Sequence, residues 1–395
     1  MASPPILYQL AAALAAAKLG AEVCTRWLHQ PAVVGEIAAG ILLGGGALGW
    51  VDPAHPAIAT LASIGAVLML FEAGLESTPG DLLKAGPAAL WVASVGVALT
   101  LGGAYAVMRA LGHSASEAAV VSAAMSATSI GITVRVLQEM HSMHLKEARV
   151  ILGAASADDV MGLLVLAVAM GMIQAHGPGA GALAKAALVA LGFLAGSMAV
   201  GPLLAPRLLD LARRMRTPGS VATAAVVLCL AVAGAAEAVS LAPVVGAFAA
   251  GLMLAPSRHV EHLRTRVGPL TELFVPVFFV VMGARLELGG INPVSPAGRA
   301  AWLLATVLLG VVVAARALAA WSLPAKHMRR GLLAAGMFPR GEVSLIAAGI
   351  GLEAGVLRPE VYPAVVLVVV GTALLAPSLM KAAARRIEEA QRANP

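Results

Sequence analysis

Two adjacent carboxylates, Asp158 and Asp159, lie inside an apolar run that extends over residues 148–173. A run of this length can cross a bilayer as one helix, which takes about 20 residues. Insertion scales put a charged side chain at the bilayer centre at about 2.5 to 3.5 kcal/mol, so such residues are normally functional. The pair is therefore the first candidate for a functional site, and a satisfied buried ion pair is its structural alternative.

Helix geometry makes the two carboxylates unequal. Successive residues of an α-helix differ by about 100° in direction, so one can face water while the other pairs with a neighbour. This counts against an intramembrane aspartyl protease, in which two carboxylates share one proton at close range. The sequence also offers no second mid-span aspartate for such a dyad and no nucleophile-base pair, so we expect no enzyme.

Other polar residues interrupt further apolar segments. Arg316 must find a carboxylate there or extend its side chain to the nearby membrane surface. Residues 126–131 and 337–342 are polar at mid-span, as unwound segments are, and Ser, Thr and charged side chains can satisfy their backbone groups. Half-helix ends carry partial charges, which Arg340 and Glu342 are expected to neutralise. For the mid-span acids Glu36 and Glu72 we expect structural roles.

The composition predicts the elements that position these residues. With 59% hydrophobic and 12% charged residues, the chain is an all-α polytopic membrane protein and not a soluble globule. Long unbroken apolar runs argue against a barrel, and 42 glycines suit helices that approach closely. The two cysteines, Cys24 and Cys229, predict neither a disulfide framework nor a thiolate metal site.

Hydropathy predicts about thirteen transmembrane helices. They cover residues 5–23, 31–50, 57–75, 84–109, 116–138, 148–173, 180–212, 218–238, 241–256, 268–288, 299–322, 330–352 and 360–380. The connecting segments rich in Lys and Arg all fall on one side, so the N-terminus is expected outside and the C-terminus in the cytoplasm. The net charge of +6 thus reflects topology and contact with anionic lipid, and it gives no reason to expect nucleic acid.

An internal repeat relates the two halves of the chain. Residues 33–40 reappear as residues 244–251, and residues 73–76 as 284–287, both displaced by the 211 positions that separate Gly35 from Gly246. The first six predicted helices therefore map onto the last six, and the seventh is a linker between them. Because one linker helix separates the halves, the two halves enter the membrane from opposite sides. Inverted repeats are typical of secondary transporters, which bind substrate near the midplane on discontinuous helices. The same displacement maps Asp158 and Asp159 onto Val369 and Val370, so only one half supplies carboxylates.

At this point the chain resembles bacterial sodium/proton antiporters of the NapA type, in the second monovalent cation:proton antiporter family, which are relatives of the Kef potassium systems. The motifs that carry the resemblance are Gln-Pro-Ala-Val-Val-Gly-Glu at 30–36, residues 127–133, residues 151–159 with the Asp-Asp pair, and Pro-Arg-Gly-Glu-Val at 339–343.

The resemblance implies an inner-membrane homodimer with no cofactor, in which a moving core carries Na+ (or Li+ or K+) and H+ across by an elevator motion in the service of pH homeostasis. Its domain boundaries would be 1–78 and 216–293 for dimerisation, 79–178 and 294–382 for the core, 179–215 for the linker and 383–395 for a cytoplasmic tail.

The resemblance also implies roles for individual residues. Asp159 would bind Na+ and the proton alternately, with Thr128 and Ser129 as further ligands at the crossing of the unwound segments. Pro339, Arg340 and Glu342 would belong to the same crossing. Asp158 would pair with a basic residue in the segment 299–322.

That basic position holds Arg316, where the related antiporters usually have a lysine. Because arginine stays charged in proteins, we expect Asp158 to stay ionised and one proton to move per cation, which makes exchange electroneutral. A Kef-type K+/H+ antiporter is the alternative, although those systems usually add a nucleotide-binding domain and this sequence ends shortly after its last predicted span. A cation channel or membrane sensor is the alternative from another class.

Overall fold

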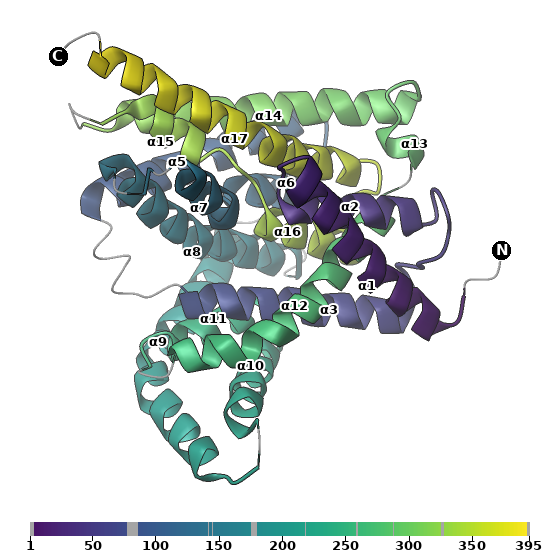
Figure 1. Ribbon diagram of the computed structural model, residues 1–395, viewed down its shortest axis with the longest axis vertical. Coiled ribbons are helices and arrows are strands. Elements are labelled where there is room, and N and C mark those ends of the chain that lie inside the picture. The colour runs from purple at the N-terminus through teal and green to yellow at the C-terminus, as the bar shows by residue number, and fades with distance from the viewer. Residues whose placement is uncertain are drawn as a thin grey trace. The chain divides into compact units, whose positions relative to one another are not determined.

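The computed structural model describes residues 4–76, 86–140, 142–143, 145–174, 180–217, 219–257, 260–286, 288–324 and 328–392, all of them helical or in connections between helices (Figure 1). The first half contains α1 Ile6–Glu22 with a π-helical turn Val23–Trp27, α2 Ala32–Leu43, α3 Pro56–Glu76, α5 Gly86–Ala110, α6 Ala115–Ser126, α7 Ile130–Glu139 and α8 Lys146–Gln174. The second half contains α9 Ala180–Arg214, α10 Ser220–Ala238, α11 Pro243–Leu254, α12 Val260–Ala284, α13 Leu288–Ile291, α14 Pro296–Ser322, α15 Arg330–Gly336, α16 Glu342–Glu353 and α17 Tyr362–Arg392.

The protein is a multi-pass helical membrane protein. Within the described ranges, 9 helices are long and apolar enough to cross a membrane, and α2 and α11 are shorter apolar helices. Two further predicted spans are broken in the middle, as α6 with α7 and as α15 with α16. The total of thirteen spans remains a prediction.

Several helix ends differ from the predicted boundaries. Helices α2 and α11 have 12 residues each, fewer than the predicted ranges 31–50 and 241–256. A run of glycines follows α2, and glycine has the largest entropic cost in a helix. In contrast, α12 begins at Val260 and not at 268, because its first turns carry charged residues that hydropathy excludes but a helix accepts.

The chain divides into two compact units. One unit contains Met1–Pro79 and Met170–Leu288, and the other contains Gly80–Ala169 and Gly289–Pro395. The first holds α1 to α3 and α9 to α12, and the second holds the two broken helices with α5, α14, α17 and most of α8. Each unit therefore takes elements from both halves of the sequence.

In the first unit, α2 packs on α12 and α3 packs on α11. Gly40 of α2 lies against the backbone of Val280, and Gly251 of α11 lies against the backbone of Phe71. A Cβ at either glycine would collide with a carbonyl oxygen, so both contacts need glycine. Gly40 and Gly251 are 211 positions apart, the displacement of the predicted repeat, and the repeat itself remains a prediction.

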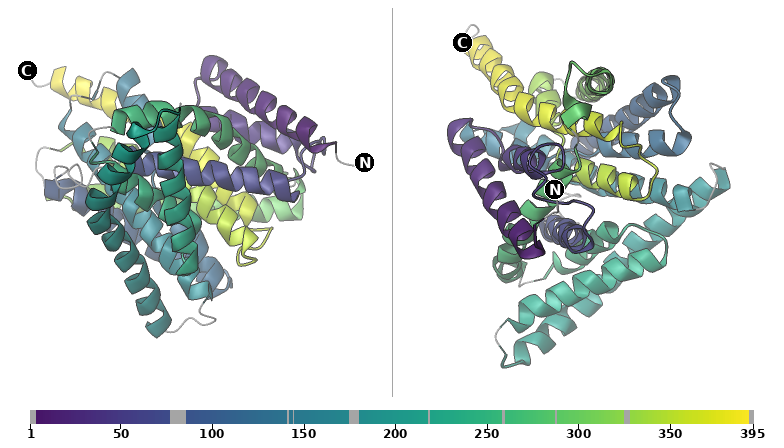
Figure 2. Two further views of the ribbon diagram at one scale, coloured as in Figure 1. Left: turned by 90° about the horizontal axis from the view of Figure 1, so that it is seen from below. Right: turned by 90° about the vertical axis from the view of Figure 1, so that its right-hand side faces the viewer.

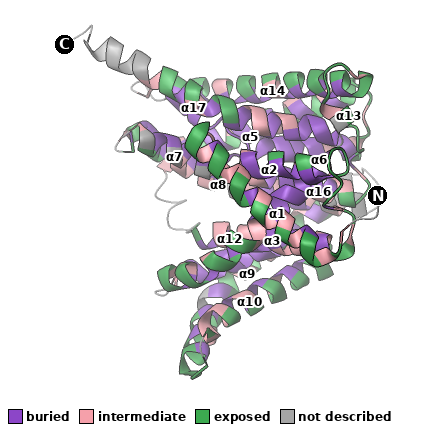
Figure 3. Cartoon of the chain, turned by 45° about the vertical axis from the view of Figure 1, so that its right-hand side comes forward, coloured by how far each residue is buried: buried purple, intermediate pink, exposed green. Residues whose placement is uncertain are grey.

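Helices α9 and α10 form an antiparallel hairpin in the first unit (Figure 2). Many of their large apolar side chains are exposed. Figure 3 colours the exposed residues of both helices green. In the second unit, most residues of α6 and α16 are buried. The exposed apolar surface is what a bilayer covers, whereas the broken helices form the interior of their unit.

The two breaks cross each other in the second unit. Residues 127–129 separate α6 from α7, and residues 337–341 separate α15 from α16. The backbone N–H of Ser129 donates to the carbonyl of Pro339 at 2.9 Å. Pro339 itself lacks an N–H group and disfavours helix in the residue before it, which explains the second break. A Cβ at Gly341 would lie 2.7 Å from the Ser129 side chain, so the crossing also needs glycine there.

Candidate functional site

The site is built around Asp158 on α8, whose side chain is 0% exposed. Nη1 of Arg316, from α14, lies 2.8 Å from Oδ2 of Asp158. The hydroxyl of Thr128, from the first break, donates to the same oxygen at 2.5 Å. An isolated carboxylate is very costly to bury, and this counter-charge and this hydrogen bond offset part of that cost.

Arg316 is itself 1% exposed, so it does not extend to the membrane surface, and that alternative was wrong. Its Nη2 donates to the carbonyl of Ser126 at 2.7 Å. Ser126 is the last residue of α6, where unpaired carbonyls give the helix end a partial negative charge. Arg316 therefore joins the carboxylate to the broken end of α6.

A second buried arginine, Arg340 from the other break, reaches the same helix end. Its Nη1 donates to the carbonyl of Ala127 at 2.7 Å and to the hydroxyl of Thr128 at 2.9 Å. Its backbone N–H donates to the hydroxyl of Thr372 on α17 at 2.9 Å. Arg340 therefore contacts the C-terminal end of α6, and Thr128 links its guanidinium to Asp158.

At the other half-helix ends, hydroxyl and carboxyl side chains form the polar contacts. Glu342 begins α16, and the hydroxyl of Ser129, at the start of α7, donates to its carboxylate at 3.4 Å. A carboxylate near helix N-termini is favourable, because the N-terminal end is partially positive. The hydroxyl of Thr133 donates to the carbonyl of Gly336 at the end of α15 at 2.8 Å. Positive side chains thus meet the C-terminal end of α6, and a negative one lies at the start of α7 and α16.

One glycine makes room for this arrangement. A Cβ at Gly96 of α5 would lie 2.5 Å from Nη1 of Arg316, the nitrogen that pairs with Asp158. Sequence reasoning missed Gly96, since nothing in a single sequence separates it from 41 other glycines. It also missed Thr372, which lies in an apolar helix with no local motif, and it gave no role to Thr133, the last residue of the motif at 127–133.

The structure brings most of the predicted site residues together, but it does not describe all of their side chains. Asp158, Arg316, Thr128 and Arg340 lie together, Ser129 and Glu342 lie at the same crossing, and Pro339 contributes a backbone carbonyl. The backbone of Asp159 lies in α8, and its side chain lies outside the described residues. Glu36 and Glu72 belong to the first unit. Among the side chains that the structure describes, no group of three or more His, Cys, Asp or Glu could hold a metal ion.

Comparison with known proteins agrees with this architecture. A sequence profile of the family described as "Sodium/hydrogen exchanger, transmembrane" matches residues 10–386. The chain belongs to the sodium/hydrogen exchanger family. Its relatives are transporters and not enzymes, and exchangers of this family need no cofactor besides the ions they carry.

Two curated relatives cover nearly the whole exchanger. The high-affinity Na+/H+ antiporter NhaS3 of Synechocystis is 34% identical, over 95% of this chain and 89% of its own. The Na+/H+-K+ antiporter GerN of Bacillus cereus is 30% identical, over 95% of each. The fold matches the sodium proton antiporter MjNhaP1 of Methanocaldococcus jannaschii with a TM-score of 0.71 at 18% identity, over 94% of each chain.

Proposed function

We propose that the protein exchanges Na+ for H+ across the plasma membrane of a bacterium, with Asp159 binding the two ions in turn. The observation that carries the proposal is that the Asp158 side chain is fully buried and already bonded to Arg316 and Thr128. If one carboxylate of the pair is fixed, the neighbouring one is left to exchange. The family and the names of both relatives support sodium and protons as the cargo.

Competition between the ions is sufficient for antiport. In general, burial favours the protonated form of a carboxylate, and a nearby cation favours the ionised form. A proton therefore leaves where sodium is abundant and returns where sodium is scarce. The carrier needs no further reactant, because only one of the two ions can occupy the carboxylate at a time.

The contacts modify the ligand set that the family resemblance implies. The Thr128 oxygen accepts from the guanidinium of Arg340 and donates its proton to Asp158. An oxygen held 2.9 Å from a guanidinium nitrogen is a poor ligand for Na+, so we assign Thr128 to holding Asp158. Asp159 and Ser129 remain the proposed sodium ligands.

We propose that alternating access results from movement of one unit while the other stays in place. The unit that holds the broken helices would be the moving core, and the unit that holds α1 to α3 and α9 to α12 would dimerise with a second copy. The NapA-type subclass, the elevator motion and the homodimer are parts of this proposal. The elevator motion is supported by the clustering of every described site residue in one compact unit.

The proposed stoichiometry follows from the arginines. Neither Arg316 nor Arg340 can release a proton in the transport cycle, because arginine stays protonated in proteins. Asp158 faces both cations and would stay ionised throughout. One proton per cation is then exchanged, and net charge does not cross the membrane.

The test is the Asp159→Asn variant in proteoliposomes, with a fluorescent dye that reports the pH gradient. Wild-type protein should dissipate the gradient when Na+ is added, whereas the variant should be inactive and still elute as folded protein. Asp210→Asn on the exposed face of α9 is the matched control and should keep full activity. Normal exchange by Asp159→Asn would remove the central role of this residue.

The same assay separates the alternatives. The name of GerN includes K+, so Na+, Li+ and K+ are added in turn, and a response to K+ alone would favour the Kef-type alternative. A channel would conduct the cation down an imposed membrane potential without a pH gradient. Saturable, proton-coupled flux that ignores the potential is the result we expect.

A further inference from the structure

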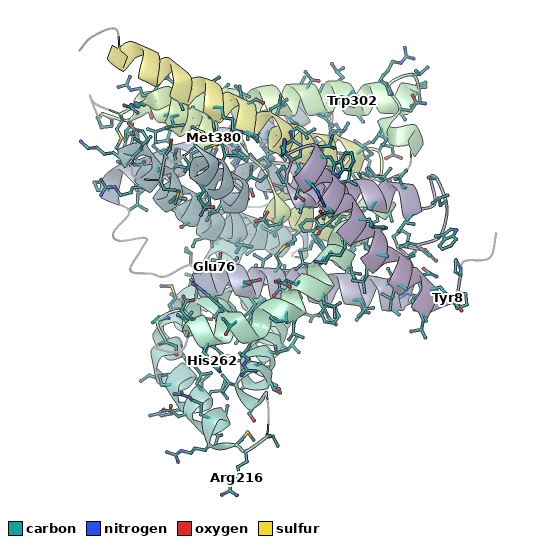
Figure 4. The ribbon with its side chains drawn as sticks, in the orientation of Figure 1. Tyr8, Glu76, Arg216, His262, Trp302 and Met380 are labelled. Atoms are coloured by element: carbon teal, nitrogen blue, oxygen red, sulfur yellow. The ribbon has the colours of Figure 1, made fainter. Side chains whose placement is uncertain are left out.

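A buried hydroxyl on α17 bonds to the backbone of the second break. Thr372 is 0% exposed, and its hydroxyl accepts from the backbone N–H of Arg340 and donates to the carbonyl of Val369, both at 2.9 Å. Because the single hydroxyl proton is used within α17, the Thr372 oxygen is left to act as an acceptor. Figure 4 labels Met380, which lies about two turns after Thr372 on the same helix.

The two breaks satisfy their equivalent N–H groups in different ways. Ser129 is 211 positions before Arg340, the displacement of the predicted repeat, and its N–H bonds to a backbone carbonyl of the second break. The position displaced from Thr372 by the same number is Met161 on α8, whose thioether is only a weak acceptor. The second break therefore depends on a side-chain hydroxyl that the first break does not have.

The peptide group between Pro339 and Arg340 is held from both sides. Its N–H bonds to the hydroxyl of Thr372, and its carbonyl accepts from the N–H of Ser129 at 2.9 Å. A peptide group is planar, so its N–H and its carbonyl turn together. If the bond to Thr372 is lost, the carbonyl is free to turn, and the position of Ser129 changes with it.

The side chain of Arg340 depends on the same peptide group, because it is bonded through one nitrogen. Its Nη1 donates to the carbonyl of Ala127 and to the hydroxyl of Thr128. The buried Nε and Nη2 make no hydrogen bond to any residue that the structure describes. A guanidinium held at one nitrogen can pivot, whereas one bonded through two is fixed in direction. The backbone of Arg340 therefore sets the direction from which Nη1 reaches Thr128.

We propose that Thr372 is a positioning residue for sodium/proton exchange. Its hydroxyl orients the peptide group that holds Ser129, which is a proposed sodium ligand, and the guanidinium that bonds Thr128. The transport consequence rests on the proposed function, whereas the bond from Thr372 to the second break can be measured without transport. Losing the hydroxyl disturbs the sodium ligand, so sodium binding should weaken more than turnover slows.

The experiment compares two substitutions of Thr372. Thr372→Val keeps the shape of the side chain and removes the hydroxyl, and Thr372→Ser keeps the hydroxyl and removes a methyl group. In proteoliposomes with a dye that reports pH, Thr372→Val should raise the sodium concentration for half-maximal proton release about tenfold, the effect of one lost hydrogen bond. Its maximal rate should fall less than about threefold. Thr372→Ser should stay within about twofold of wild type in both values.

Thr100→Val is the matched control. Thr100 is also 0% exposed and belongs to the same unit, but its hydroxyl donates at 2.7 Å to the carbonyl of Gly96 within its own helix. The control should leave both values unchanged. If Thr372→Val fails to fold, Thr372→Cys replaces the hydroxyl by a weakly accepting thiol and should raise the half-maximal sodium concentration about threefold.

Hydrogen–deuterium exchange read by mass spectrometry tests the bond without sodium transport. The segment that contains residues 337–341 should exchange at least about tenfold faster in Thr372→Val than in wild type, because an N–H group and its neighbours lose their acceptor. Thr372→Ser and Thr100→Val should exchange as wild type does. Unchanged exchange in Thr372→Val would show that the hydroxyl does not hold this break, and would leave the proposed function in place.

The transport results decide the positioning role. Unchanged sodium dependence in folded Thr372→Val, or in Thr372→Cys, would overturn it. A larger defect in Thr372→Ser than in Thr372→Val would mean that the methyl group matters for packing and the hydroxyl does not, which would also overturn it. Wild-type protein that releases no protons when sodium is added would overturn the proposed function instead, and hydrogen exchange would still decide whether Thr372 holds the second break.

Discussion

At the scale of single residues, Arg316 and Arg340 surround one described carboxylate, Asp158, and both also bond to the last carbonyls of α6. The helix end supplies only about half a negative charge, so a second anion nearby is electrostatically favoured. Asp159 is the adjacent carboxylate in the sequence. In the proposed mechanism, a proton or a cation bound to Asp159 neutralises its negative charge, while the arginines still hold Asp158.

Removing the charge of Arg316 should show how much its ion pair with Asp158 stabilises the fold. Arg316→Gln leaves Asp158 buried without its closest counter-charge, and the free energy of unfolding should fall by about 3 kcal/mol. Thermal unfolding in detergent measures this loss. The double variant Arg316→Gln/Asp158→Asn restores a neutral pair and should recover most of the midpoint. Additive losses in the double variant would show that the two side chains do not stabilise each other.

Gly96 provides a more selective test, because it touches the arginine without changing any charge. In Gly96→Ala the new methyl carbon would lie 2.5 Å from Nη1 of Arg316 and displace it, so sodium-driven proton release should slow at least about tenfold. Alanine is a better helix former than glycine, and the thermal midpoint should not reveal unfolding. Gly102→Ala on the same helix meets no atom within 4 Å and should transport normally. Equal activity of both variants would contradict the placement of Arg316.

At the scale of elements, buried glutamates secure the ends of the broken helices. Glu117 of α6 accepts from the backbone N–H of Arg358 at 3.0 Å and from its Nε at 3.1 Å, in the loop after α16. These bonds raise the pKa of Arg358, so its guanidinium stays charged. Glu147 of α8 accepts from the backbone N–H of Arg329, just before α15, at 2.9 Å. Both broken helices are thus tied to a neighbour.

Loss of the first of these contacts should loosen the crossing. Glu117→Ala leaves donors of Arg358 unpaired, and we expect about 2 kcal/mol lower stability, measured as a lower thermal midpoint. Arg358→Ala should lower it less, because this side chain is 58% exposed. Ser116→Ala, an exposed neighbour, is the control. Equal midpoints for Glu117→Ala and Ser116→Ala would show that this contact does not secure the broken helix.

The sequence predicted elements better than contacts. Apolar runs locate long helices such as α5 and α14 within a few residues, and the polar stretch with Pro339 and Gly341 predicts a break. A contact such as Glu117 with Arg358 joins residues 241 positions apart, and no local pattern encodes it. The ion pair of Asp158 with Arg316 was expected only from a family resemblance and from the cost of burying a lone charge. Their distances required the fold.

At the scale of the whole molecule, the two units divide the roles of the polar residues. All described contacts around Asp158 lie within one unit, and the mid-span acids Glu36 and Glu72 lie within the other. In the proposed mechanism, the ion site and its counter-charges move as one body. The number of charges inside that body is then constant except for the proton and the cation on Asp159.

The balance point of exchange in proteoliposomes tests this claim most directly. At a fixed pH gradient, the sodium gradient that stops net proton flux is measured at zero potential and at about −100 mV. Electroneutral exchange predicts that the balancing sodium ratio equals the proton ratio at both potentials. Two protons per sodium would instead shift the balancing ratio about 50-fold between them, because one net charge gains about 2.3 kcal/mol per 100 mV. That shift would contradict the proposal that Arg316 keeps Asp158 ionised.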